Sequence, residues 1–297
     1  MYKFKYHKPT SLEESVNLFK EKEFPKYLSG GMTLIPSMKQ LLSSPTDLID
    51  IQNIKELKGI YEAENKIIVG ALTTHNEVAH SSIIKKNIKG LSYLASKIAD
   101  NAVRNSGTIG GSICNADPAA DYPAALLSLN ATINTNIREI LAKDFFIDMF
   151  ETKLEGSEIV TSVTFPIKKK SFYLKFSSQA SKYAIVGMFG SFDGDRVSVS
   201  ITGAANKVFS LEEVNNQSSN QLKVYDFNKL EFNEILQFNK PDIGQFSLAS
   251  FAHSKNLSSV ISLSFLFSAL AKKTTKHIIN KVECFILNSL KSTKYEK

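Results

Sequence analysis

The hydrophobic and polar positions of the first quarter of the chain predict a compact α/β unit. We expect three short strands and two helices, placed at 3–6, 11–23, 27–28, 34–42 and 47–51. The first helix should begin at Ser11, which opens a capping box with Glu14. Pro36 fits the first turn of the second helix, because proline there forfeits no intrahelical hydrogen bond.

A second α/β unit is expected to begin near Leu57. Its strands are expected at 59–61, 66–69, 131–134 and 159–165, with a turn at 62–65, helices at 91–100 and 124–129, and a helix start at 142. Thr74 to Glu77 forms another capping box. The segment 159–165 alternates between two sets of side chains and is closed by Pro166, which is typical of a strand.

The last third is predicted to be a separate body, because the charged run 168–170 and the polar tract 215–220 set it apart. Strands are expected at 172–177, 189–193 and 197–202, followed by helices that end in the apolar stretch 260–271.

Composition narrows the possible functions. With 297 residues, 43% of them hydrophobic, the chain can bury an ordinary core in roughly two domains. The net charge of +7 comes from scattered lysines without a basic stripe, so nucleic acid is not an expected partner. Two cysteines and dispersed histidines predict neither a disulfide framework, an iron–sulfur cluster nor a metal site in this chain.

The apolar stretch 260–271 is shorter than the ~20 residues that a membrane span needs. The N-terminus lacks the apolar core of a signal peptide, and we therefore expect a cytoplasmic protein.

Two glycine pairs stand in similar polar settings, in Ser29-Gly30-Gly31-Met32-Thr33 and in Thr108-Ile109-Gly110-Gly111-Ser112. Adjacent glycines permit positive φ and remove the Cβ atoms that keep backbone N–H groups from an anion. The first pair also precedes a predicted helix N-terminus near Leu34, which favours a phosphate. Either pair alone would usually only tighten a turn. Their recurrence predicts two parts of one phosphate cradle.

The segment after the second pair, 113–123, predicts a rigid loop that presents Asn115, Asp117 and Asp121. A carboxylate next to a phosphate cradle can accept hydrogen bonds from ribose hydroxyls, so Asp121 is a candidate sugar ligand. Helix capping by Asp117 or Asp121 is the open alternative. Neither pair matches the Rossmann or Walker pattern, and no nucleophile elbow is present. A dinucleotide lying between two α/β units fits these observations.

Four longer segments resemble a known family and occur in its order. They read LSGGMTLIPSMK, IADNAVRNSGTIGGSICNADPAADYPAAL, REILAKDFFIDMFETKLEGSEIVTSVTFP and YLKFSSQASKYAIVG. The chain resembles the FAD-binding medium subunit of molybdenum hydroxylases, which include carbon monoxide, xanthine and aldehyde or heterocycle oxidoreductases. The resemblance implies an α+β protein with a two-lobed α/β FAD-binding domain of the vanillyl-alcohol-oxidase type. The implied bodies are 1–56 and 57–168, the two FAD-binding lobes, and 169–297, a smaller α+β domain with a short antiparallel sheet and helices.

The resemblance also implies the cofactor residues. They are Ser29, Gly30, Gly31, Met32, Thr33 and Leu34 in the first segment, Thr108, Ile109, Gly110, Gly111, Ser112 and Asn115 in the second, and Asp121, Val160, Lys175 and Tyr183. Val160 would pack near the flavin, Lys175 would lie on the cofactor side and Tyr183 would place its ring against the isoalloxazine. Strand core or solvated surface is the alternative for these three. Met32 and Ser112 depart from the residues usual in the two loops, so some hydrogen bonds there must come from the backbone.

The resemblance implies FAD in this chain and no catalytic residue, because the cofactor carries the redox chemistry. Partners are expected to be a large molybdenum-cofactor subunit that oxidises the substrate and a small [2Fe-2S] subunit, in a heterotrimer that can be doubled. Electrons would pass through those clusters to FAD and then to NAD, quinone, oxygen or another acceptor. Two alternatives stay open: a freestanding flavin oxidase of the vanillyl-alcohol type, and a scaffold without cofactor.

Overall fold

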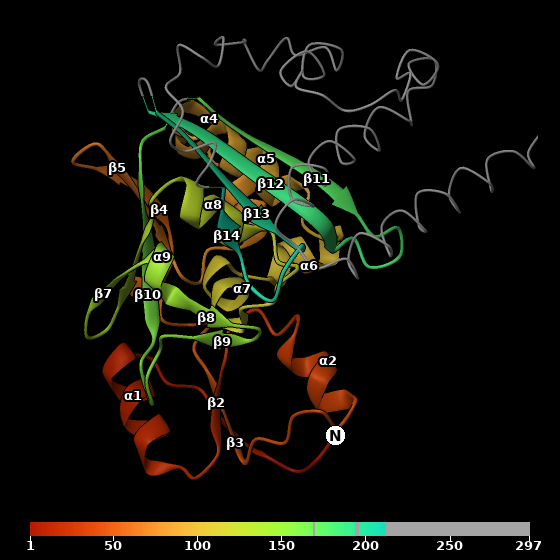
Figure 1. Cartoon of the computed structure of the whole chain (residues 1–297). Helices are drawn as coiled ribbons and strands as arrows, with labels where there is room; N and C mark the ends of the chain where they lie inside the picture. Colours follow the sequence, from red (N-terminus) through yellow and green to blue (C-terminus); the bar gives the residue numbers. More distant parts are fainter. Residues whose placement is uncertain (169, 194–195, 212–297) are drawn as a thin grey trace, which may run out of the picture. The chain divides into compact units, whose positions relative to one another are not determined.

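A computed structural model describes residues 1–168, 170–193 and 196–211. Contacts divide the chain into the units 1–221 and 222–297, and every described residue belongs to the first (Figure 1). The predicted polar tract 215–220 and the helices that end in 260–271 lie outside the described residues. Among the helices of the described part, none is long and apolar enough to cross a membrane.

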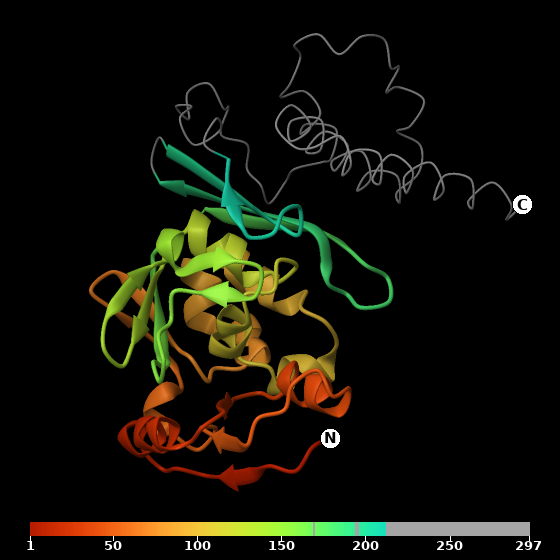
Figure 2. The same ribbon diagram turned by 60° about the horizontal axis from the view of Figure 1, so that its bottom comes forward.

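The N-terminal lobe is a parallel three-stranded sheet in the order β1-β3-β2, with one helix on each crossover. Its elements are β1 (Lys5–His7), α1 (Leu12–Glu21), β2 (Pro25–Leu28), α2 (Leu34–Lys39) and β3 (Asp47–Asp50). Figure 2 shows this lobe next to the N-terminus. Ile49, Ile54 and Leu57 form its buried core with Leu72. The expected elements are all present. The capping box is only half formed, because the Ser11 hydroxyl accepts from Glu14 N–H while the Glu14 carboxylate accepts from Thr10 N–H.

The second lobe is built on an antiparallel sheet of five strands in the order β4-β5-β10-β6-β7. Its strands are β4 (Ile60–Ala63), β5 (Lys66–Gly70), β6 (Thr132–Thr135), β7 (Glu139–Leu141) and β10 (Val160–Pro166), preceded by the 3-10 turn η1 (Lys55–Leu57). A separate hairpin pairs β8 (Phe146–Asp148) with β9 (Glu151–Thr152). The central strand β10 lies where the alternation of residues 159–165 predicted a strand.

Helices cover this sheet. They are α3 (His75–His80), α4 (Ser82–Asn87), α5 (Lys89–Ser96), α6 (Asn101–Ser106), α7 (Ile109–Asn115), α8 (Tyr122–Ser128) and α9 (Ala142–Phe145). The capping box at Thr74 is confirmed in full. The prediction of one helix over 91–100 is confirmed for 91–96 and wrong beyond, since α5 ends at Ser96 and Asp100 caps a new helix, α6. The prediction of a loop after the second glycine pair was also wrong in part, since α7 begins at Ile109, one residue before that pair, and runs to Asn115.

A four-stranded antiparallel sheet follows, formed by β11 (Ser171–Ser177), β12 (Ala184–Asp193), β13 (Arg196–Thr202) and β14 (Phe209–Ser210). It packs on α5 and α8 (Figure 1). Tyr173 and Phe189 point into the same buried core as Leu91, Leu126 and Ile133 of the second lobe. The three strands predicted here are present, although β12 begins five residues earlier than the predicted 189–193 because its first half also pairs with β11.

Candidate functional site

The first glycine segment is a turn between β2 and α2 whose backbone donors are not used by the part of the chain that the structure describes. Gly31 has φ +71°, a conformation that strains other residues. From Gly30 to Leu34, no backbone N–H donates to any of the described residues. Met32 and Thr33 are exposed, and the Thr33 hydroxyl makes no capping hydrogen bond. Consecutive unbonded N–H groups at a turn with positive φ are a concave anion site, often called a nest.

The second glycine segment is the first turn of α7 and differs from the predicted turn. Its N–H groups are largely satisfied: Ile109 donates to Thr73 O, Gly110 to Ala71 O and Gly111 to the Thr108 hydroxyl. Gly110 is needed for close packing, because a Cβ there would lie 2.7 Å from Ala71 Cβ. Thr108 caps the helix, and its own N–H has no hydrogen-bond partner in the part of the chain that the structure describes.

The two segments meet. Ser106 Oγ donates to Gly30 O at 2.8 Å, and the Thr108 and Ser29 hydroxyls are 3.3 Å apart. A Cβ on Gly30 would lie 2.2 Å from Ser106 O, and one on Gly111 would lie 2.7 Å from Ser29 Oγ. Glycine at these positions therefore allows the two lobes to approach each other, which is a different reason from the positive φ at Gly31.

Asp121 is buried, and its carboxylate is already bonded within the protein. The Tyr173 hydroxyl donates to Oδ1, and Lys175 Nζ lies 2.8 Å from Oδ1 and 3.0 Å from Oδ2. Burial raises the pKa of Asp121, and the lysine and tyrosine oppose that shift. Asp121 precedes α8 without capping it through its side chain, and Asp117 accepts from Ala119 N–H. Thus two of the predicted cofactor residues, Asp121 and Lys175, bind each other.

The remaining predicted residues differ in exposure. Tyr183 is 43% exposed in the loop before β12, and the pKa of its phenol is raised by burial and by the nearby carboxylates of Asp117 and Asp121. Asn115 is half-buried at the end of α7. Val160 lies in the hydrophobic core with 3% of its surface exposed, which is the alternative considered for it. The structure thus brings Tyr183 near Asp121 and keeps Val160 within the core.

Sequence reasoning missed two buried polar groups behind the second segment. His75 Nδ1 and the Tyr122 hydroxyl are buried without a hydrogen-bond partner among the described residues, and their rings lie 5.4 Å apart. Burial, together with the charge of Arg104, lowers the pKa of His75 to about 4. Gly107 makes room for this histidine, since a Cβ there would lie 2.7 Å from Nε2. The capping box placed His75 on a helix but gave no sign of its burial.

This arrangement can bind a diphosphate. Donors come from the N–H groups of 30–34 at the N-terminal end of α2, from the Thr33 and Ser29 hydroxyls and from the Thr108 N–H before α7. The first turns of α2 and α7 contain no acidic residue. The glycines let the two segments approach each other closely, so that these donors lie together. The residues therefore fit the diphosphate of a dinucleotide cofactor such as FAD.

Comparisons with known proteins agree with this geometry. Residues 2–168 match the family described as the FAD binding domain in molybdopterin dehydrogenase. The glyceraldehyde dehydrogenase medium chain of Sulfolobus acidocaldarius is 35% identical over 191 residues, which is 62% of this chain and 68% of that protein. The carbon monoxide dehydrogenase medium chain of Hydrogenophaga pseudoflava is 36% identical over 169 residues, which is 55% of this chain and 59% of that one.

Solved structures are similar as well. A carbon monoxide dehydrogenase structure from Hydrogenophaga pseudoflava superposes with a TM-score of 0.70 at 25% identity, covering 88% of this chain and 93% of that chain. Reconstituted CO dehydrogenase from Oligotropha carboxidovorans gives a TM-score of 0.68 at 29% identity, covering 73% and 82%.

Proposed function

The chain belongs to the FAD-binding medium subunits of the molybdenum hydroxylases, and from this premise we propose that it holds FAD between its two glycine segments as the electron-transfer subunit of a complex. The observation that carries the proposal is the run of unbonded N–H groups from Gly30 to Leu34, opposite the N-terminus of α7. In this arrangement the first segment supplies most of the donors to the diphosphate. The second supplies Thr108 and the close approach of the lobes.

Other residues would bind the rest of the cofactor. Tyr183 has an exposed ring that can lie against the isoalloxazine. The ion pair of Asp121 with Lys175 would lie close to that ring, because the Asp121 carboxylate acts on the Tyr183 phenol. Lys175 is fixed there by Asp121 and by a hydrogen bond to Lys97 O at 3.2 Å. Asp121 would reach a ribose hydroxyl only by sharing its carboxylate with Tyr173 and Lys175. Val160 would contribute as core support behind the site.

Bound FAD would supply the redox chemistry, taking electrons from [2Fe-2S] clusters of a small subunit and passing them to an external acceptor. The substrate, an aldehyde, carbon monoxide or an N-heterocycle, would be oxidised on a large molybdenum-cofactor subunit. The proposed assembly is a cytoplasmic heterotrimer that can pair into a dimer of heterotrimers. We further propose the bodies 1–56 and 57–168 as the FAD-binding lobes and 169–297 as the C-terminal domain. The chain's own residues would bind and orient the cofactor.

The test is a titration of the full chain, stripped of flavin, with FAD. We expect quenching of flavin fluorescence with one-to-one stoichiometry, and release of unmodified FAD on acid precipitation. Covalently retained flavin would support the freestanding oxidase instead, and no binding would support the scaffold. Affinity purification from the native host should bring down polypeptides that contain molybdenum and iron. Purification of a lone flavoprotein that oxidises a substrate by itself would contradict the proposed complex.

A further inference from the structure

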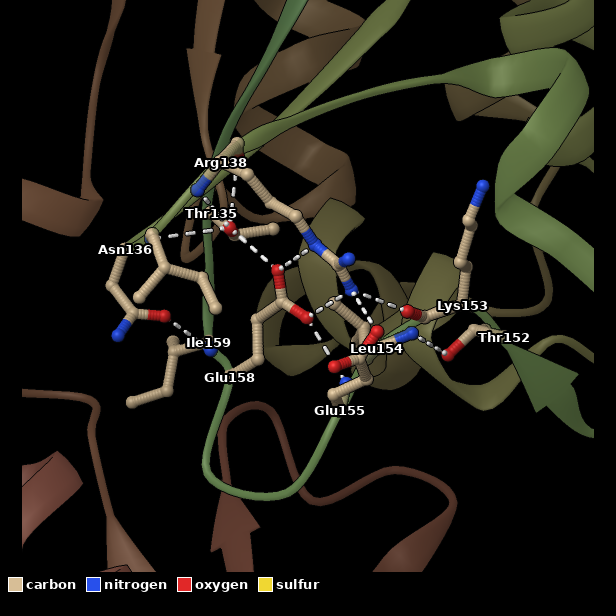
Figure 3. Close-up of polar contacts among 10 residues, drawn as sticks. Thr135, Asn136, Arg138, Thr152, Lys153, Leu154, Glu155, Glu158 and Ile159 are labelled. Atoms are coloured by element: carbon tan, nitrogen blue, oxygen red, sulfur yellow. Dashed lines mark hydrogen bonds and ion pairs between the residues drawn. The ribbon is translucent and has the colours of Figure 1, made fainter.

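An ion pair between a buried glutamate and an arginine whose side chain is 33% exposed lies away from the proposed cofactor site and takes no part in the function derived above. Arg138, in the turn between β6 and β7, contacts Glu158, in the loop before β10 (Figure 3). The contact is bidentate: Arg138 Nε donates to Oε1 at 3.0 Å and Nη2 donates to Oε2 at 2.9 Å. Two parallel charge-assisted hydrogen bonds fix orientation as well as distance. The pair therefore holds one loop rigidly against the other.

The Glu158 carboxylate is fully occupied. The Thr135 hydroxyl lies 2.8 Å from Oε1, and Glu155 N–H donates to Oε2 at 3.0 Å. The side chain has no exposed surface. Burial alone would raise the pKa of this carboxyl, but the hydrogen bonds from Arg138, Thr135 and Glu155 N–H lower it overall, so the carboxylate is charged at neutral pH. A charge buried at this cost needs a structural reason.

Arg138 also shapes the loop before Glu158. Its Nη2 donates to Lys153 O at 2.9 Å and lies 3.0 Å from Glu155 Oε1. On the other side, Asn136 N–H donates to Ile159 O, and Ile159 N–H donates to Asn136 Oδ1 (Figure 3). The loop 153–159 is thus held at residues 153, 155, 158 and 159, on both sides of Ser157.

One of those carbonyls reaches the other lobe. Ser157 O accepts a hydrogen bond from the Tyr27 hydroxyl at 3.0 Å. Tyr27 belongs to β2, two positions before Ser29, and its ring stacks on Phe19 of α1 with centroids 4.5 Å apart. The strand that leads into the first glycine segment is therefore tied to the loop that Arg138 and Glu158 hold.

Two hydrogen bonds of the described residues connect the glycine segments or their neighbours directly. Ser106 Oγ donates to Gly30 O, and the Thr108 hydroxyl donates to that of Ser29. These contacts lie at the diphosphate site, so a ligand that competes for Ser29 or Thr108 weakens them. The Tyr27 contact lies outside the site and stays available when the ligand is bound.

We propose that Arg138 and Glu158 are positioning residues for the first glycine segment, which hold the Ser157 carbonyl so that Tyr27 fixes the strand entering the diphosphate site. This inference rests on the proposed binding of FAD between the segments. In this view the distance between the two lobes is held by contacts outside the cofactor site. We call these contacts, from Arg138 and Glu158 through Ser157 O to Tyr27, the brace. Loss of the brace lets the lobes separate more freely, and the binding-competent arrangement is then populated less often.

The test compares the FAD dissociation constants of the full-length wild type and its variants. All are measured at a temperature well below the lowest Tm among them, so that every variant is folded. Tyr27→Phe removes only the interlobe hydroxyl and should weaken FAD binding about fivefold, the usual effect of one net hydrogen bond. Tyr6→Phe is the matched control, because Tyr6 lies in the same lobe and its hydroxyl bonds to Asp50 of that lobe. It should leave FAD affinity unchanged.

Glu158→Gln should weaken FAD binding by no more than Tyr27→Phe does, because it acts through the same contact. Arg138→Lys should weaken binding less than Arg138→Met, because lysine keeps the charge. The decisive readout is coupling. If the brace acts through Tyr27, Glu158→Gln in the Tyr27→Phe background costs little further affinity, whereas independent structural roles give multiplied effects.

The outcomes separate the two proposals. Wild type that binds FAD, with Tyr27→Phe indistinguishable from Tyr6→Phe or with multiplied effects in the double variant, would overturn the positioning role and leave the proposed function intact. Wild type that does not bind FAD would overturn the proposed function itself. A weakened, coupled response with an unchanged Tyr6→Phe control supports the brace.

Discussion

The Thr108 hydroxyl lies 3.3 Å from the Ser29 hydroxyl, although the two residues are 79 positions apart in the chain. Ser29 follows a strand of the parallel sheet, and Thr108 caps a helix that packs on the antiparallel sheet. Their contact brings unbonded N–H groups of one lobe opposite a helix N-terminus of the other. A diphosphate at this place would be bound by both lobes at once.

Gly30→Ala should impair FAD binding more than folding. The added Cβ would lie 2.2 Å from Ser106 O, a backbone atom that has little freedom to move, so the segments must separate. We expect FAD affinity to fall about 10- to 100-fold, which corresponds to the 1–3 kcal/mol typical of overpacking. Gly59→Ala is the control: its φ of +106° predicts lost stability, but no atom lies within 4 Å. Equal FAD affinities for the two variants would refute the explanation.

Thr33→Ala and Met32→Ala should differ. The Thr33 hydroxyl is exposed and makes no capping hydrogen bond, so it can donate to a phosphate. Its loss should weaken FAD binding about tenfold, as for a hydrogen bond to a charged group. Met32 is expected to contribute only its N–H, so Met32→Ala should change affinity less than about twofold. The two dissociation constants can be measured by flavin fluorescence, and a larger effect at Met32 would be incompatible with a backbone nest.

Lys175→Met should destabilise the FAD-free protein. Lys175 and Asp121 side chains are each 6% exposed, so removal of the lysine leaves a buried carboxyl without its cation. Breaking such a pair costs on the order of 3 kcal/mol in the free energy of unfolding, which urea denaturation measures. The exposed Lys86→Met should stay within about 0.5 kcal/mol of wild type. Similar losses in the free energy of unfolding for both variants would mean that the buried pair stabilises the protein no more than an exposed lysine does.

Protonation of His75 should lower the free energy of unfolding as the pH falls. The folded pKa is about 4, below the ordinary 6.5, so the unfolded chain binds the proton more readily. The contribution is fully present above pH 6.5 and is lost as the pH falls toward 4, by on the order of 3 kcal/mol. His75→Gln should flatten this part of the profile, whereas the exposed His80→Gln on the same helix should not. A wild-type profile that is flat between pH 6.5 and 4 would contradict the burial of a neutral imidazole.

Local sequence patterns predicted the helices and strands more accurately than they predicted the contacts of the site residues. The first glycine pair lies between a strand and a helix as predicted. Glycine marks this turn in the sequence because Gly31 has φ +71°, which a residue with a Cβ adopts only with strain. The second pair was predicted as a turn and proved to be the start of a helix. Two glycines oppose a helix by about 1 kcal/mol each, and here the Thr108 cap and the packing of Gly110 on Ala71 outweigh that propensity.

Long-range partners left no signal in the sequence. Asp121 is a candidate sugar ligand from the sequence, and only the structure shows that Tyr173 and Lys175, from a strand more than fifty positions away, bond its carboxylate. Tyr27 read as a strand residue, and only the folded chain places its hydroxyl on Ser157 O. Contacts of this kind depend on how sheets pack, which periodicity along one segment does not encode.

Backbone amide NMR of the ¹⁵N-labelled, deuterated full chain during a titration with FAD tests the central claim most directly. The account predicts the largest downfield ¹H shifts at Gly30 to Leu34, whose N–H groups gain partners, and smaller shifts at Gly110 and Gly111, whose N–H groups are bonded already. Saturation with FAD that leaves the amides of 30–34 unshifted would contradict the claim that this turn holds the diphosphate.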